Sequence, residues 1–181
     1  MTPGDARDSM EPTDGMAACE DVLAALARGD EAELRELAES RADFPDGEDP
    51  WLGRRWINHA IDAAPQTAIA WLIGRGVALN FKDAEGYPPL FTTIDSERED
   101  RLEVLRLLLS SGASPATRGI NDWTALHLAA ARNDVAALEL LLEFGADPSA
   151  RTGIDERHTP LEEAQSLGAA ETAAVLEQRR S

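Results

Sequence analysis

Apolar residues fall along the chain in short, dense runs rather than in the one-sided stripe of a surface helix. Most positions in 104–109 and in 137–142 are aliphatic. A helix of this composition has to be covered on most sides, as when it stacks between neighbouring units of a repeat. Glycines follow the apolar runs at Gly76, Gly112 and Gly145, where a left-handed residue can end a helix.

A shorter apolar segment precedes each dense run, and this pair of segments recurs. It is clearest at 124–130, where a threonine that can cap a helix opens the sequence TALHLAA. Gly112 and Gly145 are 33 residues apart, and Leu126 and Leu161 are 35 apart. A period near this length is typical of a solenoid built from helix–turn–helix units.

Helix starts can be assigned at two further places. Thr159 is a good N-cap, Pro160 suits the first helical turn, and Glu162 completes a capping box. Near the N-terminus, Asp30 is placed to cap a helix over 31–40. These signals predict paired short helices at both ends of the chain.

The repeating unit resembles the ankyrin repeat. The family's threonine-proline-leucine-histidine opening stands at 124–127 with alanine in place of proline, and at 159–162 with glutamate in place of histidine. The family's glycine-alanine-aspartate exit is literal at 145–147. The resemblance implies an all-α ankyrin-repeat solenoid of about five helix–turn–helix units with short β-hairpin loops.

The same pattern divides the chain. We expect residues 1–16 to be an acidic, disordered tail and residues 17–181 to be the ankyrin-repeat domain. Three extra residues lie around 96–100, between the two helices of the third repeat. The approximate repeats are 17–48, 49–82, 83–118, 119–151 and 155–181.

Composition narrows the class of protein. No segment approaches the roughly 20 apolar residues of a membrane span, and the N-terminus lacks the apolar run of a secretory signal. Cys19 is the only cysteine of the 181 residues, which excludes an internal disulfide and fits a reducing compartment. One lysine against sixteen arginines suggests a GC-rich bacterial genome. We expect a cytoplasmic protein.

Charge is the second signal. The formal net charge is −17, and residues 1–50 alone carry fifteen acidic residues against four arginines. Such a field repels nucleic acid and anionic lipid and speeds association with basic proteins. We therefore expect a basic protein partner, no nucleic acid and no membrane. The alternative, that acidic residues only keep the chain soluble, stays open.

Candidate binding residues lie at the hairpin tips. Tyr87 and Trp123 each stand just before a first helix, 36 residues apart, and His158 has the same place in the last repeat. Aromatic rings on adjacent tips suit hot-spot contacts with a partner. The alternative is that each ring packs against its neighbouring hairpin. Glu85 and Asp122 stand beside these rings and are candidates too.

Tryptophans and one arginine complete the set. We assign Trp51 to the groove and Trp56 to the core, although each could do the other, and Trp71 to packing. Arg132 ends a first helix, where it could pair with an acid on a partner or stay solvated. Acidic residues gather at tips and turns and could form one negative trough, or could each simply cap a turn: Asp83, Glu85, Asp95, Glu97, Glu99, Asp100, Asp122, Asp155 and Glu156.

Signals for catalysis or metal binding are absent from the sequence. His59, His127 and His158 fall one per repeat, without the short ligand spacing of a zinc site. Residues 74–76 lack the strand and the glycine set of a phosphate-binding loop. The ankyrin resemblance implies instead that His127 bonds between neighbouring hairpins. We expect no enzyme activity, no cofactor and no metal.

The resemblance implies a non-catalytic module that binds a partner protein through the groove formed by hairpin tips and first helices. Freestanding bacterial ankyrin proteins also include inhibitors, so the alternative is a stoichiometric inhibitor, an immunity protein or antitoxin, of a basic enzyme such as a nuclease toxin. A nuclease groove must attract phosphates and is therefore basic. A scaffold or adaptor stays open. The polar terminal repeats look like caps, so we expect a monomer.

Overall fold

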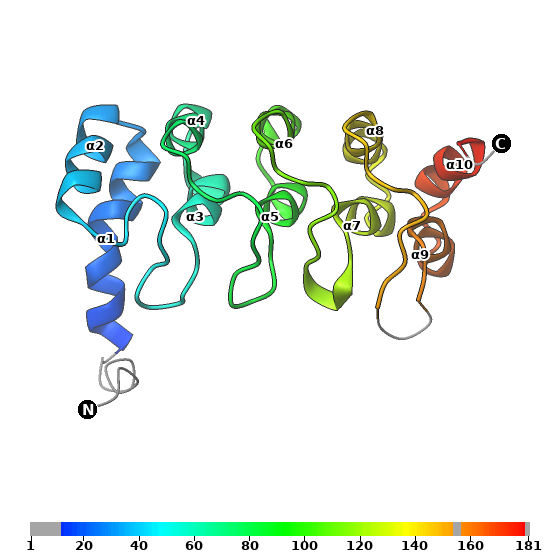
Figure 1. The fold of residues 1–181 in the computed structure, drawn as a ribbon, viewed down its shortest axis with the longest axis horizontal. Helices are drawn as coiled ribbons and strands as arrows, with labels where there is room; N and C mark the ends of the chain where they lie inside the picture. The colour runs from blue at the N-terminus through cyan, green and yellow to red at the C-terminus, as the bar shows by residue number, and fades with distance from the viewer. Residues whose placement is uncertain (1–11, 154–156, 180–181) are drawn as a thin grey trace. The chain divides into compact units, whose positions relative to one another are not determined.

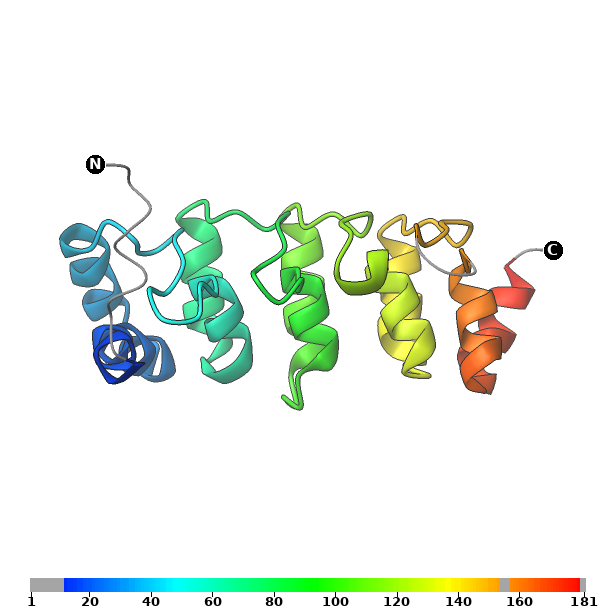
Figure 2. The same ribbon diagram turned by 90° about the horizontal axis from the view of Figure 1, so that it is seen from below.

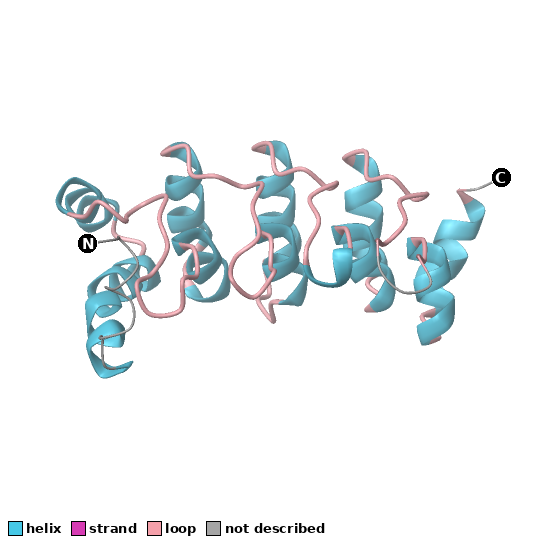
Figure 3. Ribbon diagram, turned by 60° about the horizontal axis from the view of Figure 1, so that its bottom comes forward, coloured by secondary structure: helices cyan, strands magenta, loops and turns pink. Residues whose placement is uncertain are grey.

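The computed structural model describes residues 12–153 and 157–179, with the backbone alone for residues 12–18. The chain divides into two compact units, residues 1–77 and residues 78–181. Regular structure in the described part is helical, and its loops (Figure 3) contain a single isolated antiparallel bridge, between Glu48 and Arg55, in place of strands. The predicted all-α class is therefore confirmed.

Unit 1, residues 1–77, contains four helices: α1 (Pro12–Arg28), α2 (Glu31–Ser40), α3 (Trp56–Ala63) and α4 (Gln66–Gly74). Helix α1 packs against α2 and α3, and α3 packs against α4. Leu34, Trp56 and Ile61 are fully buried among them. Helix α1 begins at Pro12, inside the segment expected to be a disordered tail, and residues 1–11 of that tail lie outside the described residues.

The start of α2 is fixed as its sequence predicts. Asp30 Oδ1 accepts hydrogen bonds from the backbone nitrogens of Ala32, at 2.9 Å, and Glu33, at 3.3 Å. The preceding Gly29 has a φ of +68°, and a Cβ there would lie 2.6 Å from Pro65. Glycine is therefore required at the bend between α1 and α2.

Unit 2, residues 78–181, contains three helix pairs and one 3₁₀ turn: α5 (Pro89–Asp95), α6 (Arg101–Ser110), η1 (Ile120–Asp122), α7 (Ala125–Ala131), α8 (Val135–Glu143), α9 (Pro160–Leu167) and α10 (Ala170–Gln178). Within this unit the first helices α5, α7 and α9 form one layer and the second helices α6, α8 and α10 form the other (Figures 1 and 2). Each helix packs against its partner in the pair and against the next helix in its own layer.

Apolar side chains fill the space between the two layers of unit 2. Phe91, Leu108 and Leu126 are fully buried there. Both predicted helix starts of this unit carry a capping box, at Thr124 and at Thr159. Local signals in the sequence were therefore sufficient to place these helices.

The turn between α5 and α6 is longer than the equivalent turn between α7 and α8. It covers residues 96–100, whereas the α7–α8 turn covers 132–134. Of the three inserted residues of the third repeat, two therefore lengthen the turn and one extends the N-terminus of α6. The paired helices keep the same packing.

Candidate functional site

A loop that turns back on itself precedes each of the helices α3, α5, α7 and α9, and we call these loops fingers. The first finger is 46–55 in unit 1, and the second, third and fourth are 82–88, 117–124 and 150–159 in unit 2. A backbone N–H···O=C bond closes each finger, in turn Asp49 to Arg54, Asp83 to Tyr87, Gly119 to Trp123 and Thr152 to His158. The predicted hairpins are thus present as closed loops.

The aromatic residues at the ends of two fingers lie along their own first helices. The Tyr87 ring makes an edge-on contact with Phe91, with centroids 6.2 Å apart. The Trp123 ring stacks on His127 at 6.5 Å. Both rings are half-buried, and each contacts the first helix of its own repeat. Their role as partner contacts stays a prediction.

Tyr87 and Arg132, two predicted contact residues from different repeats, meet through Asp95. The Tyr87 hydroxyl donates a hydrogen bond to Asp95, and burial together with this carboxylate raises the pKa of the phenol. Asp95 Oδ1 also lies 2.6 Å from Arg132 Nε. Arg132 therefore already has an acidic partner within the chain, although its side chain remains 47% exposed.

A polar cleft of about 390 Å³ opens beside this Tyr87–Asp95–Arg132 link. It lies among the end of α5, the α7–α8 turn and the start of α10, and an Arg101–Asp134 ion pair forms part of its wall. Its charged lining consists of Asp95, Glu97, Arg101, Arg132, Asp134 and Glu171. Because carboxylates outnumber guanidinium groups, the cleft favours a cationic side chain.

His127 and His158 connect two repeats of unit 2. The buried His127 ring accepts the Thr124 backbone N–H at Nδ1, over 3.2 Å, so its proton is on Nε2. Nε2 donates to the backbone carbonyl of His158 in the fourth finger, at 3.1 Å. Burial lowers the pKa of His127. The structural role that the family resemblance implied for His127 thus fits its contacts, and the His158 ring lies 3.1 Å from Glu163.

Several acidic residues at tips and turns bond within the chain. Asp83 is buried, and its carboxylate accepts the backbone N–H groups of Glu85 and Tyr87. Asp122 pairs with Arg118 at 3.1 Å. Glu85 is exposed, whereas Asp155 and Glu156 lie outside the described residues. Arg118 therefore offsets the charge that Asp122 could add to a common negative trough, whereas the Asp83 carboxylate is held within its own loop.

In unit 1 the structure confirms the assignment of Trp56 to the core, whereas the assignment of Trp51 to the groove stays a prediction. Trp56 is buried in the core, whereas Trp51 lies at the tip of the first finger with 45% of its surface exposed. Trp71 stacks on Phe44 with centroids 6.0 Å apart. Sequence reasoning missed Asp49, which organises the first finger. An aspartate two residues before Trp51 and four before Gly53 was the available signal.

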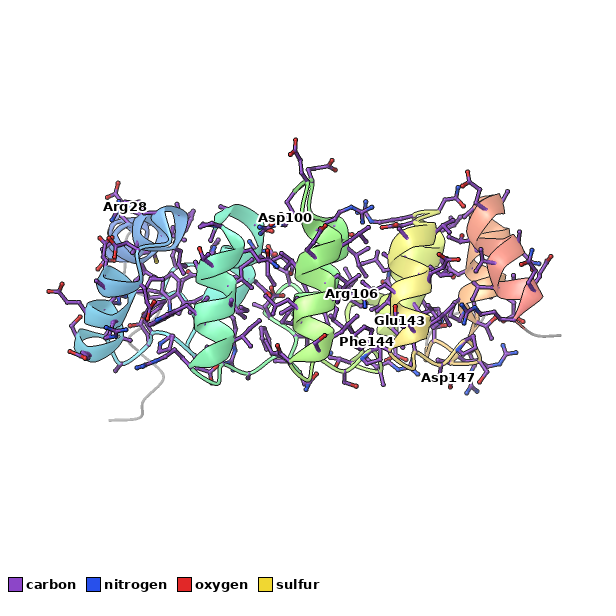
Figure 4. The ribbon with its side chains drawn as sticks, turned by 90° about the horizontal axis from the view of Figure 1, so that it is seen from above. Arg28, Asp100, Arg106, Glu143, Phe144 and Asp147 are labelled. Atoms are coloured by element: carbon purple, nitrogen blue, oxygen red, sulfur yellow. The ribbon has the colours of Figure 1, made fainter. Side chains whose placement is uncertain are left out.

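The second-helix layer of unit 2 carries its own contact between repeats. Figure 4 shows Arg106 of α6 directed toward Glu143 and Phe144 at the end of α8. The guanidinium lies 3.1 Å from the Glu143 carboxylate and 5.8 Å from the Phe144 ring centroid. This contact joins neighbouring repeats and lies outside the candidate site.

Comparison with known proteins agrees with these observations. A family model described as ankyrin repeats matches residues 97–142. An ankyrin repeat-containing protein of Treponema pallidum is 39% identical over 93 residues, which are 51% of this chain and 30% of that protein. The matched segment, residues 97–142, thus contains ankyrin repeats. Ankyrin repeats are protein–protein interaction modules, and the family is generally non-catalytic.

Other relatives carry ankyrin repeats within much longer proteins. The ankyrin repeat and SOCS box protein 3 of Bos taurus is 32% identical over 50% of this chain and 17% of its own length. The potassium channel KOR2 of Oryza sativa is 34% identical over 46% of this chain and 11% of its length. The chain thus spans less than a third of these relatives. Among the described residues, no helix is long and apolar enough to cross a membrane.

Proposed function

We propose that this ankyrin-repeat chain is a non-catalytic module that binds a basic partner protein through unit 2. The binding surface, which we call the finger face, comprises the second, third and fourth fingers and the exposed sides of α5, α7 and α9. The observation that carries the proposal is the Tyr87–Asp95–Arg132 link, because it joins two repeats beside an open polar cleft.

The chemistry of the finger face supports this assignment. Half-buried rings at Tyr87 and Trp123 are already held against their helices, so binding would order little further. The carboxylates of the adjacent cleft favour an arginine or lysine of the partner. The net charge of −17 favours a basic partner and disfavours nucleic acid and self-association. We accordingly propose a monomer that works in the cytoplasm, where its single cysteine would stay reduced.

Substitutions of the finger face test the proposal. The full chain is used as bait in a lysate of its host at low salt, and bound proteins are eluted by a salt step and identified. Tyr87→Ala and Trp123→Ala should each weaken capture of the stoichiometric partner while helical content is retained. Phe144→Ala, which removes a half-buried aromatic from the end of α8, is the matched control and should leave capture unchanged. If both finger variants bind like the wild type, the finger face is the wrong surface.

A stoichiometric inhibitor of a basic enzyme, such as a nuclease toxin, is the second candidate function. The charge of the chain favours it, because a nuclease groove attracts phosphates and would also attract an acidic protein. One basic enzyme released by salt, and inhibited at one-to-one stoichiometry by the purified chain, would support the inhibitor. A neutral partner that survives high salt would support a scaffold or adaptor instead.

A further inference from the structure

We propose that Trp51 and Leu52 form a preset apolar tip that enters an apolar, basic-rimmed pocket on a partner protein. The inference rests on the proposed protein-binding function and adds a second contact surface to it, on the first finger of unit 1. We call this pair the Trp51–Leu52 tip.

The Trp51–Leu52 tip is exposed although both side chains are large and apolar. Trp51 is 45% exposed and Leu52 is 49% exposed. The same positions of the second finger, counted back from its first helix, are Ala84 and Glu85. The finger conformation therefore does not require an apolar pair at its apex. Covering it with a partner would remove apolar surface from water.

A buried carboxylate holds the tip in place. Asp49 is 2% exposed and accepts three backbone N–H groups of its own loop. Asp49 Oδ1 binds the nitrogens of Trp51, at 2.9 Å, and Leu52, at 2.5 Å, and Oδ2 binds the nitrogen of Arg54 at 2.9 Å. Three bonds to one carboxylate fix the backbone on both sides of the apex.

Helix α3 supplies a fourth bond to the same carboxylate. His59 Nε2 lies 2.9 Å from Asp49 Oδ2, so the finger is tied to the helix that follows it. Burial alone would raise the pKa of Asp49, but the bonds from His59 and from the Leu52 and Arg54 amides outweigh burial and lower it. The carboxylate therefore stays ionised as an acceptor for all four donors.

Ion pairs close the base of the first finger. Arg54 lies 2.5 Å from Asp62 of α3, and Arg55 lies 3.3 Å from Asp46 at the start of the finger. The apex is thus anchored on both sides before any partner arrives. A loop fixed in its binding conformation loses little entropy on association, and tryptophan is among the residues most often found at binding hot spots.

The net charge of the chain indicates the chemistry of the partner's pocket. Residues 1–50, which lead up to the tip, carry a net charge of −11, and the whole chain carries −17. A second copy of the chain and an anionic membrane would both be repelled. A pocket that is apolar inside matches the Trp51–Leu52 tip, and lysine or arginine at its rim matches the net negative charge of the chain.

Selection of synthetic binders against the full chain tests the tip directly. The probe is a yeast-displayed library of a small helical scaffold with randomised surface positions. Selected clones should bind Trp51→Ala and Leu52→Ala variants at least about tenfold more weakly than wild type, as expected for a hot spot. Leu167→Ala truncates another exposed leucine, in α9, and is the matched control that should retain binding. The randomised positions should be enriched in apolar residues together with lysine and arginine.

Four outcomes would overturn the inference. Clones that tolerate Trp51→Ala, or whose selected positions are enriched in acidic residues, would show that the tip is not the preferred site. Clones that depend on Trp123 instead would refute the tip and leave the proposed finger face intact. Binding to phosphatidylcholine vesicles that Trp51→Ala abolishes would assign the tip to a membrane.

The role of Asp49 is tested separately, by amide hydrogen exchange. Asp49→Asn should speed exchange at Trp51, Leu52 and Arg54 and weaken the selected clones, although both apolar side chains remain. His59→Phe removes one bond to the carboxylate and keeps the other three, so it should speed amide exchange at the tip by a smaller factor. It also tests the role of Asp49 if Asp49→Asn fails to fold. Unchanged exchange at the tip in His59→Phe and in a folded Asp49→Asn would show that the carboxylate does not hold the finger.

Discussion

In unit 2, individual polar side chains contact residues of the neighbouring repeat, which lie far away in the sequence. Arg132 meets Asp95 from the previous repeat, and His127 meets the carbonyl of His158 in the next. Two ionisable groups at these contacts, the Tyr87 phenol beside Asp95 and the buried His127 ring, therefore have pKa values shifted from their ordinary values. Their titration can therefore report on the packing of the repeats.

Tyr87 offers the cleanest measurement, because it is the only tyrosine in the chain. Burial and the neighbouring Asp95 raise the pKa of its phenol above the ordinary value of about 10. A spectrophotometric titration of tyrosinate absorbance should place the midpoint above that value. Asp95→Asn should lower the midpoint, since it removes the negative charge. An unshifted midpoint in the folded wild type would contradict the link between Tyr87 and Asp95.

Because His127 is buried, we expect the free energy of unfolding to fall in mild acid. Burial lowers its pKa, as does Arg118, while the backbone bond to His158 and the acids Glu163 and Asp122 oppose the shift. Below the ordinary histidine pKa of about 6.5 the unfolded chain binds a proton that the folded chain excludes. The contribution of His127 is therefore fully present above that pH and is lost as the pH falls toward the folded-state pKa.

Chemical denaturation between about pH 8 and pH 5 measures this effect, because the window brackets the ordinary histidine pKa. Wild-type unfolding free energy should fall toward the acid end, and the fall should be smaller in a His127→Gln variant, whose amide does not titrate and can still reach back to the helix start. Other acid-sensitive groups are common to both chains, so the difference isolates His127. Equal slopes would contradict the predicted titration.

Sequence reasoning was accurate for residues whose partners lie a few positions away. The caps at Asp30 and Thr159 follow from local spacing, and both form as predicted. Arg132 was expected to be solvated or to meet a partner, because nothing local announces that Asp95 lies beside it. Contacts between repeats depend on how the helices stack, and the local sequence pattern does not show which side chains of neighbouring repeats come together.

At the level of elements, each short helix of unit 2 depends on its ends as well as on its buried face. Helices of seven to ten residues are too short to be stable alone in water, and packing supplies most of their stability. Their first turns nevertheless hold unpaired N–H groups that must be satisfied. The capping boxes at Thr124 and Thr159 do this within the chain.

Thr159→Ala tests the contribution of one such cap. The hydroxyl accepts the Glu162 N–H, and the Glu162 carboxylate accepts the Thr159 N–H at 2.7 Å. The substitution should destabilise unit 2 by about 1 kcal/mol, as typical for loss of an N-cap, measured by urea denaturation. Thr159→Ser keeps the acceptor and should lose much less. Equal losses in the two variants would assign the effect to the methyl group.

Elements could be predicted from the sequence more fully than the site. The apolar runs and the glycines located α6 and α8 to within three residues, and the capping residue Thr159 located the start of α9 to the residue. The conformation of the first finger was missed: the spacing of Asp49 was the available local signal, but its burial and its bond to His59 depend on packing against the following helix. Of the acids that the sequence placed at tips and turns, Asp83 caps its turn through the backbone N–H groups of Glu85 and Tyr87, which was one of the two roles expected.

For the whole molecule, the dominant property is a net charge of −17 on 181 residues. Like charges repel more strongly in the compact chain than in the unfolded one, so this charge opposes folding. Local ion pairs such as Arg106–Glu143 are exposed and offset little of it. The balance between these effects should depend on ionic strength.

Thermal unfolding in increasing sodium chloride tests this balance. Screening of the net charge should raise the Tm between about 20 mM and 500 mM salt, because the Debye length falls below the spacing of most surface charges. A charge-neutral osmolyte at the same osmolarity controls for general solvent effects. A Tm that falls with salt would show that attractive ion pairs outweigh the net repulsion.

The long turn at 96–100 has a practical consequence. It holds two residues more than its counterpart at 132–134, yet α5 and α6 pair as α7 and α8 do. Since the entropy of closing a loop grows only with the logarithm of its length, this turn can take additional residues cheaply. It follows the C-terminal end of α5, whereas the second finger precedes the N-terminal end. An epitope or fluorophore-binding tag inserted between Glu97 and Arg98 would thus give the chain an attachment point at the other end of α5 from the second finger, beside the polar cleft that Glu97 lines.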